Sequence, residues 1–375
     1  MPVSVNASGS CALHDGLTTR EQLMRLILML ALLFAAPVAA QTYDFTPVTQ
    51  QIDALLQREG LGGASLVVIR NGVVIDEEYF GNFDSATRIP IASASKWLSA
   101  LAIERLVEQG SISWSDTVGQ YLPLAPVDKQ NITLGELFSH TSGMSNMDAA
   151  CLSDQSVTLQ TCCQQILAMP LLFSPGVAFV YTGNGMQIGG CMAEVATAKS
   201  WDQIFQDEVT QPLGMNQTDF ATSSLQAPYV SVPNPRIGGG VRSTLHDYAK
   251  VVQMVVQQGF WQGGPYLTAA SLADMQRDQT DGAPFVYSPD PVSFGYGYGE
   301  WRNLVDAQGD AVQVSSTGKF GSSPWIDHET GVAAVFLVFN NQTRMPCDLK
   351  RLWRNVRNVV LGGERVFSDD FDCTQ

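Results

Sequence analysis

A serine and a lysine stand three residues apart in the segment Ser93-Ala-Ser-Lys96, which opens a stretch with helical periodicity. Residues i and i+3 of a helix share one face, with Cβ atoms about 5–6 Å apart. A serine at the start of a helix also turns its backbone N–H, and the positive helix end, toward an incoming oxyanion. We therefore expect Ser93 to be an acyl-transfer nucleophile and Lys96 its base. An ordinary lysine, with a pKa of about 10.4, is a poor base at neutral pH, so burial should lower the pKa of Lys96.

The motif alone leaves an alternative open. Serine is a favoured N-cap, so the same residues fit a helix-capping serine followed by a surface lysine. A second pair at this spacing, Ser316 and Lys319, lies in a glycine-containing segment predicted as strand, where helical spacing does not apply. Two other hydrolase signatures, Gly-x-Ser-x-Gly and His-Glu-x-x-His, are absent from the sequence.

The elements that position this pair follow from the apolar pattern. Residues 46–58 and 348–361 have the period of amphipathic helices, and residues 93–108 read as a helix that Gly110 ends. Strands are predicted at 64–70, 73–80, 297–301, 311–314, 317–326 and 331–339, the first two joined as a hairpin at Asn71-Gly72. Further helical patterns occupy the middle of the chain, at 157–168, 185–198, 244–258 and 268–277.

This order of elements predicts an α+β fold, an antiparallel sheet flanked by N- and C-terminal helices with a mostly helical region inserted. We expect one domain, residues 41–366, with the sheet part at about 45–110 and 292–362 and the helical part at about 111–291. An acidic tail, residues 367–375, follows.

The N-terminal residues 1–40 have the features of a secretory signal peptide. Arg20 and Arg25 precede the apolar run 26–36, and a small-residue cleavage site follows at 37–40. The apolar run is far shorter than the roughly 20 residues that span a bilayer. We expect cleavage near Ala40 and a periplasmic or secreted mature protein, and Met24 is a possible true start.

The net charge of −15, from 36 acidic and 21 basic residues, disfavours binding to nucleic acid or to an anionic membrane. Six cysteines follow the signal peptide, an even number that indicates disulfides in an oxidising compartment. We expect Cys347 to pair with Cys373, and the adjacent Cys162 and Cys163 to have separate partners, Cys151 and Cys191. No Cys-x-x-Cys pair or histidine cluster indicates zinc, and we expect neither a metal nor another cofactor.

Further segments make the chain similar to the serine β-lactamase and penicillin-binding protein superfamily, in particular to its class C, D,D-peptidase and family VIII esterase branch. They are Ile132-Thr-Leu-Gly-Glu-Leu-Phe-Ser-His140-Thr-Ser-Gly143, Pro175-Gly-Val-Ala-Phe-Val-Tyr181-Thr-Gly-Asn184, Pro212-Leu-Gly-Met215, Gly238-Gly-Gly-Val-Arg-Ser-Thr-Leu-His-Asp247 and Gly331-Val-Ala-Ala-Val-Phe-Leu-Val-Phe339. The resemblance covers about residues 46–362 and implies a β-lactamase/transpeptidase-like fold.

The resemblance also implies roles for single residues. Ser93 would be the acylated nucleophile, Lys96 its base partner and Tyr181 a third proton-transfer group. The backbone N–H groups of Ser93 and Lys319 would form the oxyanion hole. The substrate-binding strand motif beside the nucleophile would consist of Ser316, Thr317 and Gly318.

Two positions depart from the pattern of these enzymes. Their usual Tyr-x-Asn is Tyr181-Thr-Gly183 here, with Asn184 one place late as the expected substitute for the substrate-amide contact. The strand motif begins with Ser316 instead of Lys or His, so the cation that meets a substrate carboxylate is missing. Strand alternation would point Lys319 away from the site, and the arginines that could replace the cation are Arg242 and Arg302.

We therefore expect an exported serine hydrolase that forms an acyl-enzyme, a carboxylesterase acting on small neutral esters. The alternatives are a β-lactamase or D,D-carboxypeptidase, and a non-catalytic binding module on the same fold. The expected partner is a small-molecule ester or amide, with no nucleic acid and no stable membrane anchor after cleavage. The oligomeric state is not indicated.

Other residues have structural explanations beside functional ones. We expect His140 to hold a turn by hydrogen bonds. Tyr296, Tyr298 and Trp301 fit either a pocket lining or a packed strand edge. The acidic residues near the C-terminus resemble a calcium cluster, but a solvated tail explains them better; they are Asp369, Asp370 and Asp372.

Overall fold

The computed structural model describes residues 42–220, 230–289, 293–342 and 345–363, and the statements below concern these residues. The chain divides into two units, residues 1–43 and Asp44–Gln375, and the second holds the fold. The predicted signal peptide, the possible start at Met24, the acidic tail and Cys373 lie outside the described residues. Within the described residues, no helix has the length and apolarity needed to cross a bilayer.

A six-stranded antiparallel sheet forms the centre of this unit and joins both ends of the chain. Its strand order is β10-β11-β12-β13-β1-β2. The strands are β1 (Gly63–Arg70), β2 (Val73–Gly81), β10 (Trp301–Val305), β11 (Ala311–Ser315), β12 (Ser323–Asp327) and β13 (Val332–Val338). β1 pairs with β13 from Ala64 opposite Val338 to Arg70 opposite Val332. Both central strands are nearly continuous apolar runs because both of their faces are covered.

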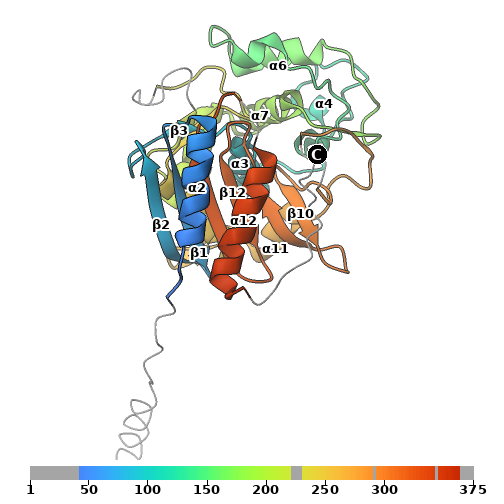
Figure 1. The fold of residues 1–375 in the computed structure, drawn as a ribbon. Coiled ribbons are helices and arrows are strands. Elements are labelled where there is room, and N and C mark those ends of the chain that lie inside the picture. The colour runs from blue at the N-terminus through green and yellow to red at the C-terminus, as the bar shows by residue number, and fades with distance from the viewer. Residues whose placement is uncertain (1–41, 221–229, 290–292, 343–344, 364–375) are drawn as a thin grey trace, which may run out of the picture. The chain divides into compact units, whose positions relative to one another are not determined.

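Two helices from opposite chain ends cover one face of the sheet. α2 (Thr46–Glu59) and α12 (Pro346–Leu361) lie side by side in front of it in Figure 1, and α12 contacts both α2 and β13. α10 (Leu245–Val256) contacts β13, β1 and β12. All seven residues of β13 are buried, so both faces of this strand are covered. α12 covers one face, and α10 covers the other. α3 (Ser95–Glu108) and α11 (Ala269–Gln276) also lie behind the sheet.

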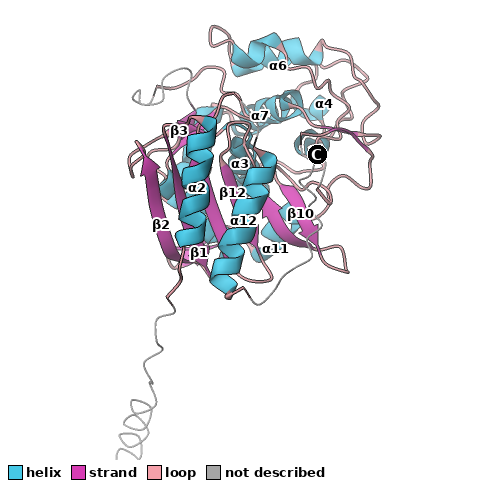
Figure 2. Ribbon diagram, in the orientation of Figure 1, coloured by secondary structure: helices cyan, strands magenta, loops and turns pink. Residues whose placement is uncertain are grey.

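The middle of the chain forms the inserted helical region, which Figure 2 shows gathered beyond one end of the sheet. Its helical segments are α4 (Val118–Tyr121), α5 (Leu134–Phe138), η2 (Ala150–Ser153), α6 (Leu159–Leu167), α7 (Gly183–Thr197), α8 (Trp201–Phe205), η3 (Gln206–Thr210) and α9 (Gln211–Leu213). Short strand pairs connect it, namely β3 (Ile89–Pro90) and β5 (Asp219–Phe220) on β6 (Val241–Ser243), β4 (Phe179–Val180) on β9 (Phe285–Tyr287), and β7 (Phe260–Trp261) on β8 (Gly264–Pro265). The predicted α+β architecture is confirmed.

Three predicted boundaries were wrong, and glycines or turns explain each. The strand expected at 297–301 is β10, which begins only at Trp301 because Gly299 has a left-handed φ of 81°. The strand expected at 317–326 starts at Ser323, since Gly318 and Gly321 form a turn before it. The helix expected from Ser93 starts at Ser95, after the 3-10 turn η1 (Ala92–Ala94).

Two cysteine pairs tie α6 to its neighbours. The sulfur atoms of Cys151 and Cys162 lie 2.01 Å apart, and those of Cys163 and Cys191 lie 1.96 Å apart. The adjacent cysteines Cys162 and Cys163 therefore have separate partners, as expected. The pairing of Cys347 with Cys373 stays a prediction, because Cys373 lies outside the described residues.

Replacing Cys163 and Cys191 together with serine should lower the free energy of unfolding. The bond closes a loop with a sequence separation of 28, and chain entropy gives about 3–4 kcal/mol for a loop of that size. Urea unfolding of the oxidised protein and the double variant measures the difference. Unchanged midpoints, or free thiols at both positions in non-reducing peptide maps, would contradict the disulfide.

Candidate active site

The predicted nucleophile lies in the turn that leads into α3. Ser93 belongs to η1, whose first residue, Ala92, has a left-handed φ of 47°. Such strained backbone is held only by its surroundings and is common at active sites. Lys96 Nζ lies 3.3 Å from Ser93 Oγ and donates to it. Ser93 is partly exposed and Lys96 is buried, so the structure disagrees with the capping alternative, in which the lysine would be a surface residue.

Lys96 is buried, and the loss of contact with water disfavours its charge. Its Nζ donates to Gly238 O at 2.6 Å and lies 4.7 Å from the ring centroid of Tyr181. Burial lowers the pKa of Lys96 to about 7; the nearby Arg236 also lowers this pKa, and Asp148 opposes the shift. A substantial fraction of Lys96 is then neutral near pH 7 and able to accept a proton.

Tyr181 joins this pair from the segment between β4 and α7. The Tyr181 ring stacks on the Trp301 ring, with their centroids 5.3 Å apart. The centroid of the His140 ring lies 4.4 Å from that of Tyr181. His140 is buried, its Nδ1 accepts from the Thr182 N–H at 3.4 Å, and its carbonyl accepts from the Val180 N–H. Burial holds the pKa of His140 well below its usual value, so the imidazole is neutral. His140 thus fixes the backbone on each side of Tyr181 and packs against its ring, which agrees with the expected structural role.

The cleft in which these residues meet has a volume of about 450 Å³. One wall comes from the helical region, with Asn146, Asp148, Tyr181, Thr182, Gly183, Arg236, Gly238 and Gly239. The other comes from the sheet domain, with Trp301, Thr317, Gly318, Lys319, Phe320, Gly321 and residues of the start of α12, including Leu349 and Lys350. Trp301 therefore lines the cleft, whereas Tyr296 and Tyr298 are buried, and Tyr298 stacks on Trp114.

Of the residues in and after the predicted strand motif, Thr317, Gly318 and Lys319 line the cleft and Ser316 does not. Thr317, Gly318 and Lys319 line the cleft in the segment that follows β11, beside Ser93. A Cβ on Gly318 would lie 2.1 Å from the Ile91 carbonyl oxygen, so only glycine lets this segment approach the nucleophile turn so closely. The arrangement is compatible with an oxyanion hole from the N–H groups of Ser93 and Lys319, which stays a prediction.

Ser316 does not line the cleft. It is buried, and its hydroxyl donates to Gly299 O at 3.0 Å and lies 3.3 Å from Ser93 O. It therefore anchors the nucleophile turn and brings no cation to the site. The argument from strand alternation at Lys319 was wrong, because β11 ends at Ser315 and Lys319 lies in the following turn, among the residues that line the cleft.

Asn184 is likewise placed away from the cleft. It is buried, its Oδ1 accepts from the Ala149 N–H at 3.1 Å, and its Nδ2 donates to Ser145 O and Met147 O at 2.9 and 2.8 Å. Its amide holds the loop 145–149, so the expected contact with a substrate amide is not available in this arrangement.

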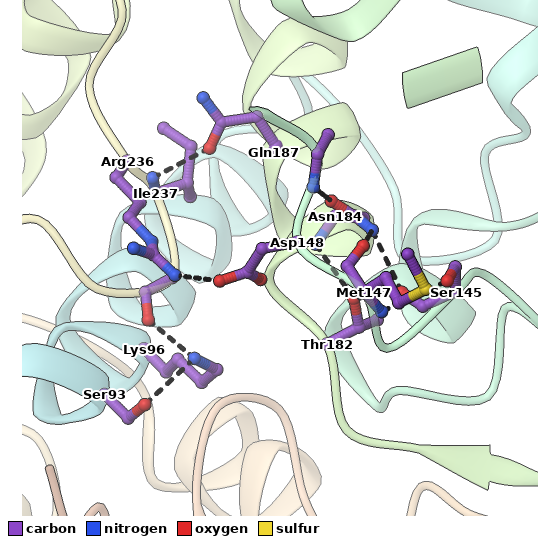
Figure 3. A network of polar contacts seen from close by, with 12 residues as sticks. Ser93, Lys96, Ser145, Met147, Asp148, Thr182, Asn184, Gln187, Arg236 and Ile237 are labelled. Atoms are coloured by element: carbon purple, nitrogen blue, oxygen red, sulfur yellow. Dashed lines mark hydrogen bonds and ion pairs between the residues drawn. The ribbon is translucent and has the colours of Figure 1, made fainter. Parts of the chain in front are cut away.

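The charged residues that the sequence missed are Asp148 and Arg236. Both line the cleft, and Arg236 Nη2 lies 2.5 Å from Asp148 Oδ2 (Figure 3). Arg242 and Arg302, the cations considered from the sequence, do not line it. Arg242 is buried against Asp219, and Arg302 donates to the carbonyls of Gln276 and Phe294. Among the described residues, no cluster of His, Cys, Asp or Glu has the arrangement of a metal site.

Comparisons with known proteins agree on the family. A family model described as Beta-lactamase matches residues 48–358. Protein flp of Staphylococcus aureus (strain MW2) is 26% identical over 203 residues, 49% of this chain and 40% of that protein. The chain thus spans less than half the length of the curated relatives it matches.

Solved structures show the same fold. A candidate beta-lactamase from Bacteroides dorei is 33% identical, with a TM-score of 0.76 over 85% of this chain and all of that one. A family VIII carboxylesterase, at 20% identity, has a TM-score of 0.67 over 84% of this chain and 97% of its own. A penicillin-binding protein homologue from Pyrococcus abyssi, described as octameric, is also 20% identical, with a TM-score of 0.68 over 85% and 78%.

Proposed function

The chain belongs to the beta-lactamase family, whose members are generally serine hydrolases, and from this premise we propose that it is an exported serine hydrolase that forms an acyl-enzyme on Ser93. The observation that carries the proposal is the 3.3 Å contact between Ser93 Oγ and the buried Nζ of Lys96. Lys96 takes the hydroxyl proton while Oγ attacks the substrate carbonyl carbon. As the ester C–O bond breaks, the departing alkoxide takes up the proton that Lys96 accepted from Ser93. Water then hydrolyses the acyl-serine ester, which releases the carboxylic acid and returns a proton to Ser93 Oγ.

Tyr181 lies next to Lys96 and supports this proton path. Its ring lies under Nζ at 4.7 Å and is fixed between Trp301 and His140. A tyrosine held this rigidly can pass a proton to the leaving group without large movement. We assign Tyr181 as the third proton-transfer group of the site.

The preferred substrates in this proposal are small neutral esters. Position 316 supplies no charge, since Ser316 is buried and donates to Gly299 O. Arg236, on the helical wall, is paired with Asp148 at 2.5 Å. On the helical wall, a substrate carboxylate would therefore meet a cation that Asp148 already neutralises, whereas a neutral ester needs no cation.

A second candidate is hydrolysis of a β-lactam or a D-alanyl peptide. Two observations favour it: Lys319 and Lys350 are among the residues that line the sheet-domain wall, and the 33% identical structure is described as a candidate beta-lactamase. A cation on that wall would attract the carboxylate that both substrates carry.

Side-by-side assays separate the two candidates. For the mature protein, kcat/KM for p-nitrophenyl butyrate should exceed that for a chromogenic cephalosporin and for a D-Ala-D-Ala peptide by at least about tenfold, or about 1.4 kcal/mol. Faster hydrolysis of the cephalosporin than of the ester would show that cations elsewhere in the cleft replace the one that is missing at position 316. The assignment as an esterase would then be wrong.

Export is part of the proposal. The signal-peptide pattern of residues 1–40 supports a periplasmic or secreted protein. The two close cysteine pairs, Cys151 with Cys162 and Cys163 with Cys191, support it as well, because disulfides persist in oxidising compartments.

A further inference from the structure

The helical wall of the cleft carries a pair of opposite charges beside the nucleophile. Asp148 and Arg236 come from two separate loops, and both line the cleft together with Ser93 and Lys96 (Figure 3). We infer that Asp148 sets the charge specificity of this enzyme by occupying Arg236 as a resident carboxylate, so that an anionic substrate finds the arginine already filled. The inference rests on the proposed esterase function and names the residue that enforces its preference for neutral substrates.

The contact between the two side chains has the geometry of a carboxylate held by a guanidinium. Arg236 Nη2 lies 2.5 Å from Asp148 Oδ2, while the side chains are 38% and 50% exposed. A pair this open to solvent contributes little to stability, about 1 kcal/mol or less. The ion pair instead affects the charge of the cleft. It neutralises Arg236, and Asp148 would repel a second carboxylate that enters the cleft.

A glycine, Gly183, borders the space that Asp148 occupies. At position 183, where the related enzymes usually carry asparagine, a Cβ would lie 3.4 Å from Asp148 Oδ1. That separation is an ordinary van der Waals contact, so position 183 lies directly beside the carboxylate. Gly183 brings no side chain of its own there, and Asp148, from another loop, supplies the polar group at this point of the cleft.

Buried amides from one helix hold both loops in place. Asn184 of α7 accepts from the Ala149 N–H and donates to Met147 O, which fixes the backbone on each side of Asp148. One turn later, Gln187 accepts from the Ile237 N–H at 3.0 Å and donates to Pro235 O at 2.9 Å, which fixes the backbone on each side of Arg236.

Both amides are nearly inaccessible to solvent. The backbone on which the ion pair stands is therefore held by buried hydrogen bonds from α7. The sequence-based expectation that Asn184 contacts substrate is replaced by a positioning role for Asn184 and Gln187.

A substitution that keeps the shape of Asp148 and removes its charge tests the inference. In Asp148→Asn, the ratio of kcat/KM for mono-p-nitrophenyl glutarate to that for p-nitrophenyl butyrate should rise at least about tenfold over the unmodified protein. The gain should be lost in the double variant D148N/R236Q, because the freed guanidinium is its cause. Asp207→Asn is the matched control, since it removes the same charge from an exposed pair with Lys199 outside the cleft lining.

A binding measurement decides the question without catalysis. In a Ser93→Ala background, calorimetric titration with glutarate should show at least about tenfold tighter binding when Asp148 is also asparagine. If the unmodified protein cleaves neither ester, the proposed function fails, and the glutarate titration still decides the role of Asp148. Should Asp148→Asn not fold, Asp148→Ser gives the same comparison. An unchanged glutarate affinity, or a substrate ratio that rises equally in D148N/R236Q, would overturn the inference.

Discussion

Replacing Ser93 with alanine is expected to lower kcat/KM for p-nitrophenyl butyrate by about 10³-fold or more, as the removal of an acylated nucleophile does. Ser93 Oγ is the hydroxyl that lies 3.3 Å from a buried amine. The two threonine hydroxyls of the cleft are engaged elsewhere: Thr182 Oγ1 donates to Ser145 O, and Thr317 Oγ1 lies 3.3 Å from Ser323 Oγ. Neither is placed to replace the nucleophile.

Covalent labelling gives the control for this result. A fluorophosphonate should add one label to the unmodified protein, mapped to Ser93 by peptide mass spectrometry, and none to Ser93→Ala. Ser111→Ala, which removes an exposed serine beyond the end of α3, should label like the unmodified protein. A label on Ser316 or Thr317, or a Ser93→Ala variant that retains turnover, would show that the nucleophile is misassigned.

The parts of the fold that the sequence predicts are those with a repeating apolar pattern. α2 and α12 show one apolar face each, and β1 and β13 are apolar runs of strand length, so their positions follow from periodicity. The starts of β10 and β12 were predicted less well. There the chain makes close turns at Gly299 and Gly321, both with left-handed φ, and glycine has no side chain whose pattern could mark the boundary.

The residues of the candidate site were also predicted best where the chain pattern is local. Ser93 and Lys96 lie on one short segment whose geometry is local, and the family resemblance adds Tyr181, so all three meet as expected. The Asp148–Arg236 pair joins residues 88 positions apart on two loops without periodicity, and only the fold brings them together. Asn184 and Ser316 were given substrate contacts by their place in a motif, yet their hydrogen bonds go to backbone groups.

Substituting Lys96 with methionine should lower kcat by about 10²-fold or more, the usual contribution of a positioned general base. Lys96→Arg should not restore the rate, because a guanidinium stays protonated and cannot accept the serine proton. Tyr181→Phe should also lower kcat, and the double variant with Lys96→Met should lose less than the two single effects combined, since both groups serve one proton path. Additive losses would show that Tyr181 acts independently of Lys96.

The pH profile of the unmodified protein reports the same group. The neutral amine is the active form of Lys96, and burial lowers its pKa to about 7. The rate should therefore fall as the pH decreases through about 7, and it should be flat above that value until another group titrates. An acid limb centred near 4 to 5, where carboxylates ordinarily titrate, would assign the base to an acidic residue instead.

Stability provides a readout that a merely structural lysine would not give. In the folded protein the pKa of Lys96 is lowered, so between pH 7 and about 10 the unfolded chain binds a proton that the folded protein does not. The free energy of unfolding of the unmodified protein therefore increases with pH through this window. Lys96→Met, which removes the buried amine, should be the more stable protein at pH 7, and its advantage should shrink toward pH 10. A variant that is both inactive and less stable at pH 7 would show that Lys96 supports the fold and that its loss of activity has another cause.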